Sequence, residues 1–67
     1  MMEWVKFPVV GSGGKEYFYG SKKDGKLYHV VWDKGIHKWL CQIDHSIAAV
    51  MDTEVKAKQY LEREVGV

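Results

Sequence analysis

Five short segments rich in apolar and aromatic residues follow one another along the chain, turn-forming residues recur between them, and the fourth segment alternates between a more apolar and a more polar face. The five segments are Glu3 to Val10, Glu16 to Ser21, Leu27 to Trp32, His37 to Ile43 and Ile47 to Met51. Alternation with a period of two is typical of strands whose two faces meet different surroundings. Short, regularly spaced segments of this kind predict an antiparallel β-meander of four or five strands.

The pair Asp24-Gly25 is the strongest turn signal in the chain. Both central residues of a type I′ turn need a positive φ, which glycine adopts freely and aspartate tolerates. An aromatic segment precedes the pair and a β-branched, aromatic segment follows it. We therefore expect a tight hairpin between the second strand and the third.

The period of the pattern changes after Met51, where Ala57, Tyr60 and Leu61 follow one another at helical spacing. Asp52 or Thr53 is expected to cap this helix, because its side-chain oxygen can accept a bond from a free backbone N–H of the first turn. Gly66 is expected to end it. Residues at this spacing form one stripe, so the helix should lay the stripe on the sheet.

These elements predict an α+β fold, a single domain over residues 1–67 in which one C-terminal helix packs on one face of the sheet. On the fourth segment, Trp39 and Ile43 are expected to meet the helix. The third segment is apolar on both faces, with Leu27, His29 and Val31 on one and Tyr28, Val30 and Trp32 on the other. A strand of this kind is normally covered twice, so another molecule should provide the second cover.

Nine aromatic residues crowd the chain, and eight of them precede the helix. We expect the face away from the helix to carry Tyr28, Val30 and Trp32, joined by Tyr17 and Tyr19 where these share that face. Buried aromatic side chains dominate the energetics of many protein interfaces. The predicted function is a small non-enzymatic interaction module that forms a homodimer or docks on a partner protein through this face.

Ten basic and nine acidic residues give a net charge of +1, but their distribution is uneven. Residues 1–40 carry seven lysines against four carboxylates, whereas residues 41–67 carry three basic residues against five acidic ones. Aromatic rings can stack on bases while neighbouring lysines contact phosphates. The alternative function is therefore nucleic-acid binding through the sheet face, by Lys22, Lys23, Lys26, Lys34 and Lys38.

The length of 67 residues and the single cysteine, Cys41, narrow the functional classes. A chain of this size has a small core, and oligomerisation often stabilises such chains. One cysteine allows no disulfide within the chain and fits a reducing compartment. No apolar run reaches membrane-spanning length. We expect a cytoplasmic protein with no membrane partner, and not an enzyme, because an active-site cleft is hard to build in so few residues.

His29, His37 and Cys41 are the best candidates for metal ligands in this sequence. Structural zinc sites use four ligands, which typically arrive as close pairs such as Cys-x-x-Cys. The chain has one cysteine and no such pair, and His45 is expected in a turn away from the other three residues. We therefore expect no metal, no cofactor and no catalytic residue, with Cys41 as a buried thiol.

Residues 38–62 run from a Trp-bearing strand through a second strand and an Asp-Thr pair to an alanine-centred helix. This order resembles the DNA-binding domains of plant ethylene-response factors and the arm-binding domains of tyrosine-family integrases. It also resembles short phage and prophage proteins. The resemblance implies structural roles for Trp39, Ile43, Thr53, Ala57 and Tyr60. It implies either DNA binding or a phage-encoded accessory (viral) protein.

Overall fold

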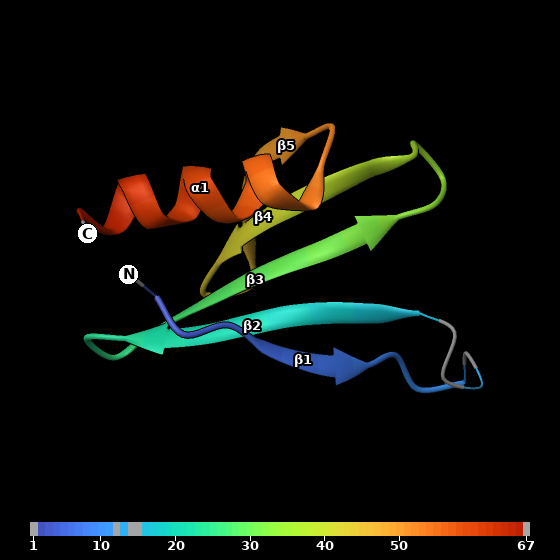
Figure 1. The fold of residues 1–67 in the computed structure, drawn as a ribbon, viewed down its shortest axis with the longest axis horizontal. Coiled ribbons are helices and arrows are strands. Elements are labelled where there is room, and N and C mark those ends of the chain that lie inside the picture. Colours follow the sequence, from blue (N-terminus) through green and yellow to red (C-terminus); the bar gives the residue numbers. More distant parts are fainter. Residues whose placement is uncertain (1, 12, 14–15, 67) are drawn as a thin grey trace.

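The structure, a computed structural model, describes residues 2–11, 13 and 16–66, and its elements are five strands followed by one helix (Figure 1). The strands are β1 (Val5–Pro8), β2 (Tyr17–Lys23), β3 (Lys26–Asp33), β4 (Lys38–Ile43) and β5 (Ser46–Met51), and the helix is α1 (Glu54–Val65). Each strand pairs antiparallel with the next along the chain. The predicted α+β fold, a meander with a C-terminal helix, is confirmed.

Two tight turns close the hairpins at one end of the sheet. Asp24 and Gly25 have φ values of 52° and 79°, as the predicted β2–β3 hairpin requires. Asp44 and His45, with φ values of 49° and 69°, form the turn between β4 and β5. Asp44 donates its backbone N–H to the Leu27 carbonyl at 2.8 Å, and its Oδ1 accepts the Leu27 N–H at 3.0 Å. These two bonds hold the β4–β5 turn against the start of β3.

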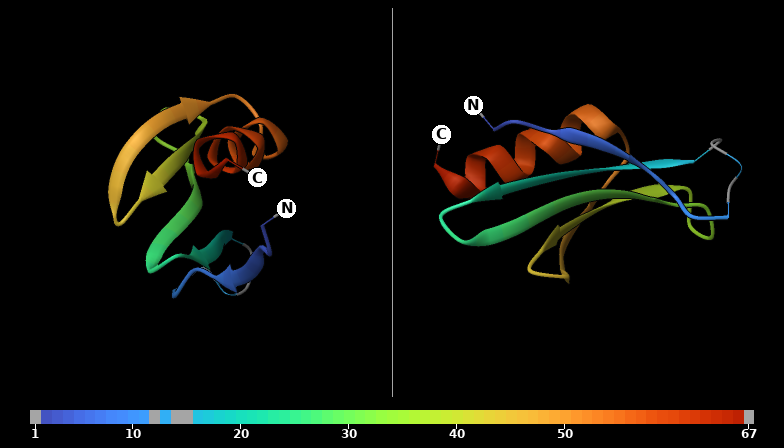
Figure 2. Two further views of the ribbon diagram at one scale, coloured as in Figure 1. Left: turned by 90° about the vertical axis from the view of Figure 1, so that its left-hand side faces the viewer. Right: turned by 90° about the horizontal axis from the view of Figure 1, so that it is seen from below.

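α1 begins and ends where the sequence predicts. Thr53 Oγ1 accepts the Lys56 backbone N–H at 3.1 Å, and Gly66 ends the helix with a φ of 83°. The helix lies on the concave side of the curved sheet (Figure 2), where its backbone is close to β3, β4 and β5. Among the described residues, the α1 backbone does not approach β1 or β2, and α1 contacts β2 through a side chain, that of Lys58. The helix therefore leaves the β1–β2 part of this face open.

The core lies between α1 and the middle of the sheet. Its buried apolar residues are Met2, Tyr28, Val30, Cys41, Ala57 and Leu61. Val30 and Cys41 are directly paired on β3 and β4, and the Cys41 thiol donates to the Ala57 carbonyl at 3.6 Å. Trp39 and Ile43 pack against this cluster, as expected. The predicted helical stripe therefore faces the sheet.

The structure reverses the predicted faces of β3. Tyr28 is 6% exposed and Val30 is 0% exposed, both in the core on the helix side, so their predicted position on the face away from α1 is wrong. Directly paired residues share a face, and Val30 pairs with Tyr19 on one side and Cys41 on the other. Alternation divides residues between two faces, but it does not say which face a later helix will cover.

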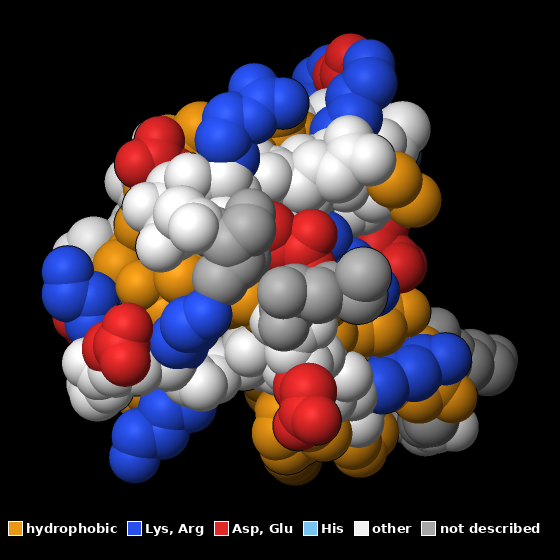
Figure 3. Space-filling view, turned by 60° about the vertical axis from the view of Figure 1, so that its left-hand side comes forward, with side chains coloured by type: hydrophobic (Ala, Val, Ile, Leu, Met, Phe, Trp, Pro, Cys, Tyr) orange, Lys and Arg blue, Asp and Glu red, His pale blue; other side chains and the backbone are white. Residues whose placement is uncertain are grey.

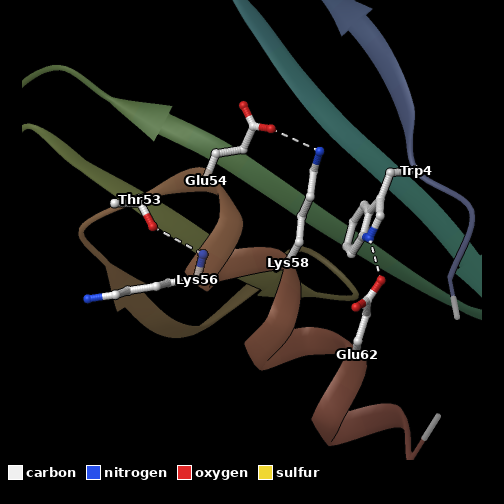
Figure 4. A network of polar contacts seen from close by, with 6 residues as sticks. All are labelled: Trp4, Thr53, Glu54, Lys56, Lys58 and Glu62. Atoms are coloured by element: carbon white, nitrogen blue, oxygen red, sulfur yellow. Dashed lines mark hydrogen bonds and ion pairs between the residues drawn. The ribbon is translucent and has the colours of Figure 1, made fainter.

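Side chains of α1 contact the segment before β1, as Figure 4 shows for Glu62 and Trp4, and they also contact β2. Trp4 Nε1 donates to Glu62 Oε2 at 3.2 Å, which fixes the segment before β1 against the helix. Lys58 Nζ lies 2.9 Å from Glu54 Oε2 one turn away, and the same ammonium lies over the Tyr19 ring of β2. Within the described residues, α1 is too short and too polar to cross a membrane.

Candidate interaction surfaces

The sheet face away from α1 carries an unbroken apolar row across the five strands. The row consists of directly paired residues, one from each strand: Phe7, Phe18, Val31, Leu40 and Val50. We call these five residues the outer row. Val31 follows the buried Val30 on β3, and Leu40 precedes the buried Cys41 on β4. Because side chains alternate along a strand, the outer row lies on the face opposite this buried pair.

The two ends of the outer row are open to solvent. Phe7 is 40% exposed on β1 and Val50 is 46% exposed on β5. The Phe7 ring stacks on Phe18 with centroids 5.3 Å apart, and Gly20 leaves room for it, because a Cβ there would lie 3.0 Å from Phe7 Cε2. Val5, Leu27 and Ile47 add exposed apolar side chains beside the row.

Figure 3 shows one face of the molecule with its side chains coloured by type. Hydrophobic side chains reach the surface in several places, between lysine and carboxylate side chains. A monomeric protein commonly exposes single apolar residues, and these need no explanation. A row continuous across five strands is a different feature, because contiguous apolar patches mark interaction sites.

A second surface lies on the helix side, where α1 leaves β1 and β2 open. It is a groove of about 720 Å³ with an aromatic lining from Tyr17, Tyr19, Trp32 and Trp39, and we call it the aromatic groove. The Trp39 ring centroid lies 5.4 Å from that of Trp32 and 6.5 Å from that of Tyr19. Val31 and Leu40 of the outer row are also part of its lining, because they directly precede Trp32 on β3 and follow Trp39 on β4.

Lysine ammonium groups lie over both tyrosine rings of the groove. Lys6 Nζ is 4.1 Å from the Tyr17 centroid, and Lys58 Nζ is 3.7 Å from the Tyr19 centroid. Both distances are typical of cation–π contacts. Burial raises the pKa of Tyr19 above its ordinary value, and a hydrogen bond to the Glu54 carboxylate raises it further. The Tyr19 phenol is therefore neutral at physiological pH.

The five residues predicted to bind a partner divide between the core and the aromatic groove. Tyr28 and Val30 are core residues, whereas Tyr17, Tyr19 and Trp32 line the groove. That these three contact a partner stays a prediction. The prediction missed the outer row, although alternation had already placed Val31 on the face opposite Val30.

The five lysines predicted to bind nucleic acid do not form one patch. Lys22, Lys23 and Lys26 flank the β2–β3 turn, and Lys34 and Lys38 flank the β3–β4 turn at the opposite end of β3. A strand of this length separates the two groups by about 24 Å. Lys34 pairs with Glu16 at 3.4 Å, and Lys38 pairs with Asp52. The sheet therefore presents two separate groups of lysines.

The three candidate metal ligands do not converge. His29 lies on the outer face, Cys41 is buried on the other face, and His37 is in the β3–β4 turn. Among the described residues, no group of three or more side chains could hold a metal ion. Cys41 is the buried thiol that the sequence predicts, and burial raises its pKa.

His29 contacts His45 instead, and the expectation that His45 lies apart is wrong. The two rings stack with centroids 5.4 Å apart. The physical reason is the pair of hydrogen bonds between Asp44 and Leu27, which brings the β4–β5 turn beside β3. Burial lowers the pKa of His29 below its ordinary value of 6.5, and the neighbouring His45 lowers it further. In the described structure, His29 Nδ1 is buried without a hydrogen-bond partner.

Acid is expected to destabilise the fold through His29. Because the folded-state pKa is lowered, the contribution of neutral His29 is complete above about pH 6.5 and is lost as the pH falls through the folded-state pKa. The urea midpoint should therefore be lower at about pH 5 than at about pH 7.5, and His29→Gln should reduce this difference. His37→Gln, at an exposed turn position, is the matched control. An equal pH dependence in His29→Gln and the wild type would contradict this assignment.

No protein-family model, no curated protein and no solved structure matches the chain. The resemblances to phage accessory proteins and to the two kinds of DNA-binding domain therefore stay predictions from the sequence. Function has to be inferred from the outer row and the aromatic groove themselves.

Proposed function

We propose that this chain is a small, non-enzymatic protein-interaction module whose outer row packs against the outer row of a second copy. One observation carries the proposal: five directly paired apolar side chains cross the sheet on the face that α1 does not cover. Water exclusion from such a surface is the dominant driving force of most protein association. The proposal retains the homodimer expected from the sequence and moves its interface to other residues.

A second copy suits this face because the two rows are alike and carry no charge. Packing one row on the other buries no unpaired charged group, which would oppose association. The ion pairs Lys34–Glu16 and Lys38–Asp52 lie beside the row, toward the β3–β4 turn, and their side chains are partly exposed to water. Self-association also supplies apolar burial that one helix cannot provide in a chain of 67 residues.

The size of the face sets the expected strength of the dimer. The whole outer face, with five strands about 4.8 Å apart and about 17 Å long, measures roughly 400 Å², which is an upper limit for the apolar row within it. Two such faces in contact cover roughly 800 Å² in total, just below the ~1,000 Å² expected of a biological interface. We therefore expect a weak dimer whose population depends on protein concentration.

Sedimentation velocity over a range of protein concentrations tests the proposal. The wild type should shift from monomer to dimer as its concentration rises. Val50→Asp, at the edge of the outer row and outside the aromatic groove, should weaken the dimer at least about tenfold, because association would bury its carboxylate. Val55→Asp is the matched control, since Val55 is 60% exposed on α1, away from the row.

A wild type that stays monomeric throughout the concentration range contradicts the proposal. So does a dimer that persists in Val50→Asp. Nucleic-acid binding stays a prediction from the sequence, and the separation of the two lysine groups gives it no added support.

A further inference from the structure

We infer that the aromatic groove binds a proline-rich segment of a partner protein in the polyproline II conformation. The groove lies on the helix side of the sheet and the outer row on the other side, so the inference does not require self-association. Four aromatic side chains line it, and aromatic-lined grooves are the usual docking surfaces for proline-rich segments. The hydrogen-bonding groups and charges of the groove decide between this ligand and others.

Two hydrogen-bond donors of the groove have no acceptor among the residues that the structure describes. In the described part of the chain, neither the Trp32 nor the Trp39 indole N–H has a hydrogen-bond partner. The third indole, that of Trp4, is bonded to Glu62 outside the groove. An indole N–H can donate but cannot accept. A ligand for this groove should therefore bring acceptors.

The carboxylates of the groove already have partners. Glu54 lies 2.9 Å from Lys58 Nζ. Asp33 Oδ1 accepts the Gly35 backbone N–H at 2.9 Å, and Glu16 lies 3.4 Å from Lys34 Nζ. A ligand that also brings N–H donors would have to compete with these contacts.

The charges around the groove also balance. Its lining contains the basic residues Lys6 and Lys34 and the acidic residues Glu16, Asp33 and Glu54, and Lys58 adds a third positive charge beside Glu54. The formal sum is zero, so the groove attracts neither a cationic nor an anionic ligand over distance. An uncharged ligand is the best match.

A polyproline II segment meets all of these requirements. Proline has no backbone N–H, so such a segment presents carbonyl acceptors without donors. Its backbone has no internal hydrogen bonds and is already extended, so the segment loses little conformational entropy when it binds. The single proline of this chain, Pro8, lies within β1, so the segment would come from another molecule.

Titration of the ¹⁵N-labelled full chain with a decaproline peptide, followed by NMR, tests the inference. The indole N–H resonances of Trp32 and Trp39 should shift and saturate, whereas that of Trp4 should stay in place as an internal control. A glycine-serine peptide of equal length should cause no saturable shift. Performing the titration in the Val50→Asp variant separates peptide binding from self-association.

Tyr17→Leu and Trp32→Leu should each weaken decaproline binding at least about tenfold, because stacking surface is lost. Tyr17 is 39% exposed, so the Tyr17→Leu variant should stay folded even if the Trp32→Leu variant unfolds. The inference is overturned if millimolar decaproline leaves the Trp32 and Trp39 resonances unchanged. Aromatic side chains can also bind a methylated ammonium group. The inference is therefore also overturned if a peptide with trimethyllysine saturates the groove and decaproline does not.

Discussion

Val30→Asp is expected to unfold the chain, whereas Val31→Asp, one residue later on the same strand, should leave it folded. Val30 is 0% exposed beneath α1, and a carboxylate there would lose its water without gaining a partner. An uncompensated buried charge costs about 3–5 kcal/mol. A domain of this length is stabilised by roughly 3–10 kcal/mol in total, so Val30→Asp removes much or all of the stability.

Val31 lies on the outer row, where its side chain is directly paired with Phe18 and Leu40 and is not covered by α1. A carboxylate at this position can stay in contact with water in the monomer. Far-UV circular dichroism and urea unfolding of both variants measure the contrast. Unfolding of both variants to the same extent would show that the outer row is also part of the core of one chain.

Leu61→Ala has the second largest expected effect. Leu61 is 0% exposed and packs with Val30 and Cys41 in the core. Removing a buried leucine side chain costs about 2–5 kcal/mol, because apolar contacts are lost and a cavity remains. The thermal midpoint should fall steeply, since this cost is a large part of the stability of so small a domain.

Val55→Ala on the same helix is the matched control for Leu61→Ala. Val55 is 60% exposed, and alanine has the higher helix propensity, so this change should be within about 0.5 kcal/mol of the wild type. Differential scanning calorimetry measures both midpoints. Equal effects of the two substitutions would mean that α1 does not pack on the sheet through Leu61.

The elements of the fold could be predicted because local signals specify them. The Asp24-Gly25 pair predicts a hairpin because these two residues readily adopt the backbone conformation of a tight turn. Thr53 and Gly66 mark the ends of the helix through contacts within one turn. The buried stripe of Ala57 and Leu61 follows from helical spacing alone. None of these predictions depends on how distant parts of the chain meet.

The faces of the sheet could not be predicted with the same information. The alternation of Val30 and Val31 is plain in the sequence, but which of them is buried depends on the side to which α1 returns after β5. Aromatic size favoured Tyr28 and Trp32 as interface residues. In so small a core, however, the Tyr28 ring fills the space beneath the helix.

The sequence does not predict a groove. It predicts an aromatic face away from α1 that contains Trp32, with Tyr17 and Tyr19 where they share that face, and it expects Trp39 to meet the helix. In the structure, Trp39 both packs on the core and lines the groove with these three residues. The contact between His29 and His45 had no local signal. It depends on the hydrogen bonds between Asp44 and Leu27, which join residues far apart in the sequence.

The most direct test of the outer row as an interface is an intermolecular NOE measurement on a mixture of ¹³C-labelled and unlabelled chains at high concentration. We expect cross-peaks between the methyl groups of Val31, Leu40 and Val50 in one copy and the rings of Phe7 and Phe18 in the other. Intermolecular contacts at Tyr17, Tyr19 and Trp32 in place of these, or no intermolecular contacts in a sample that sediments as a monomer, would contradict the proposed interface.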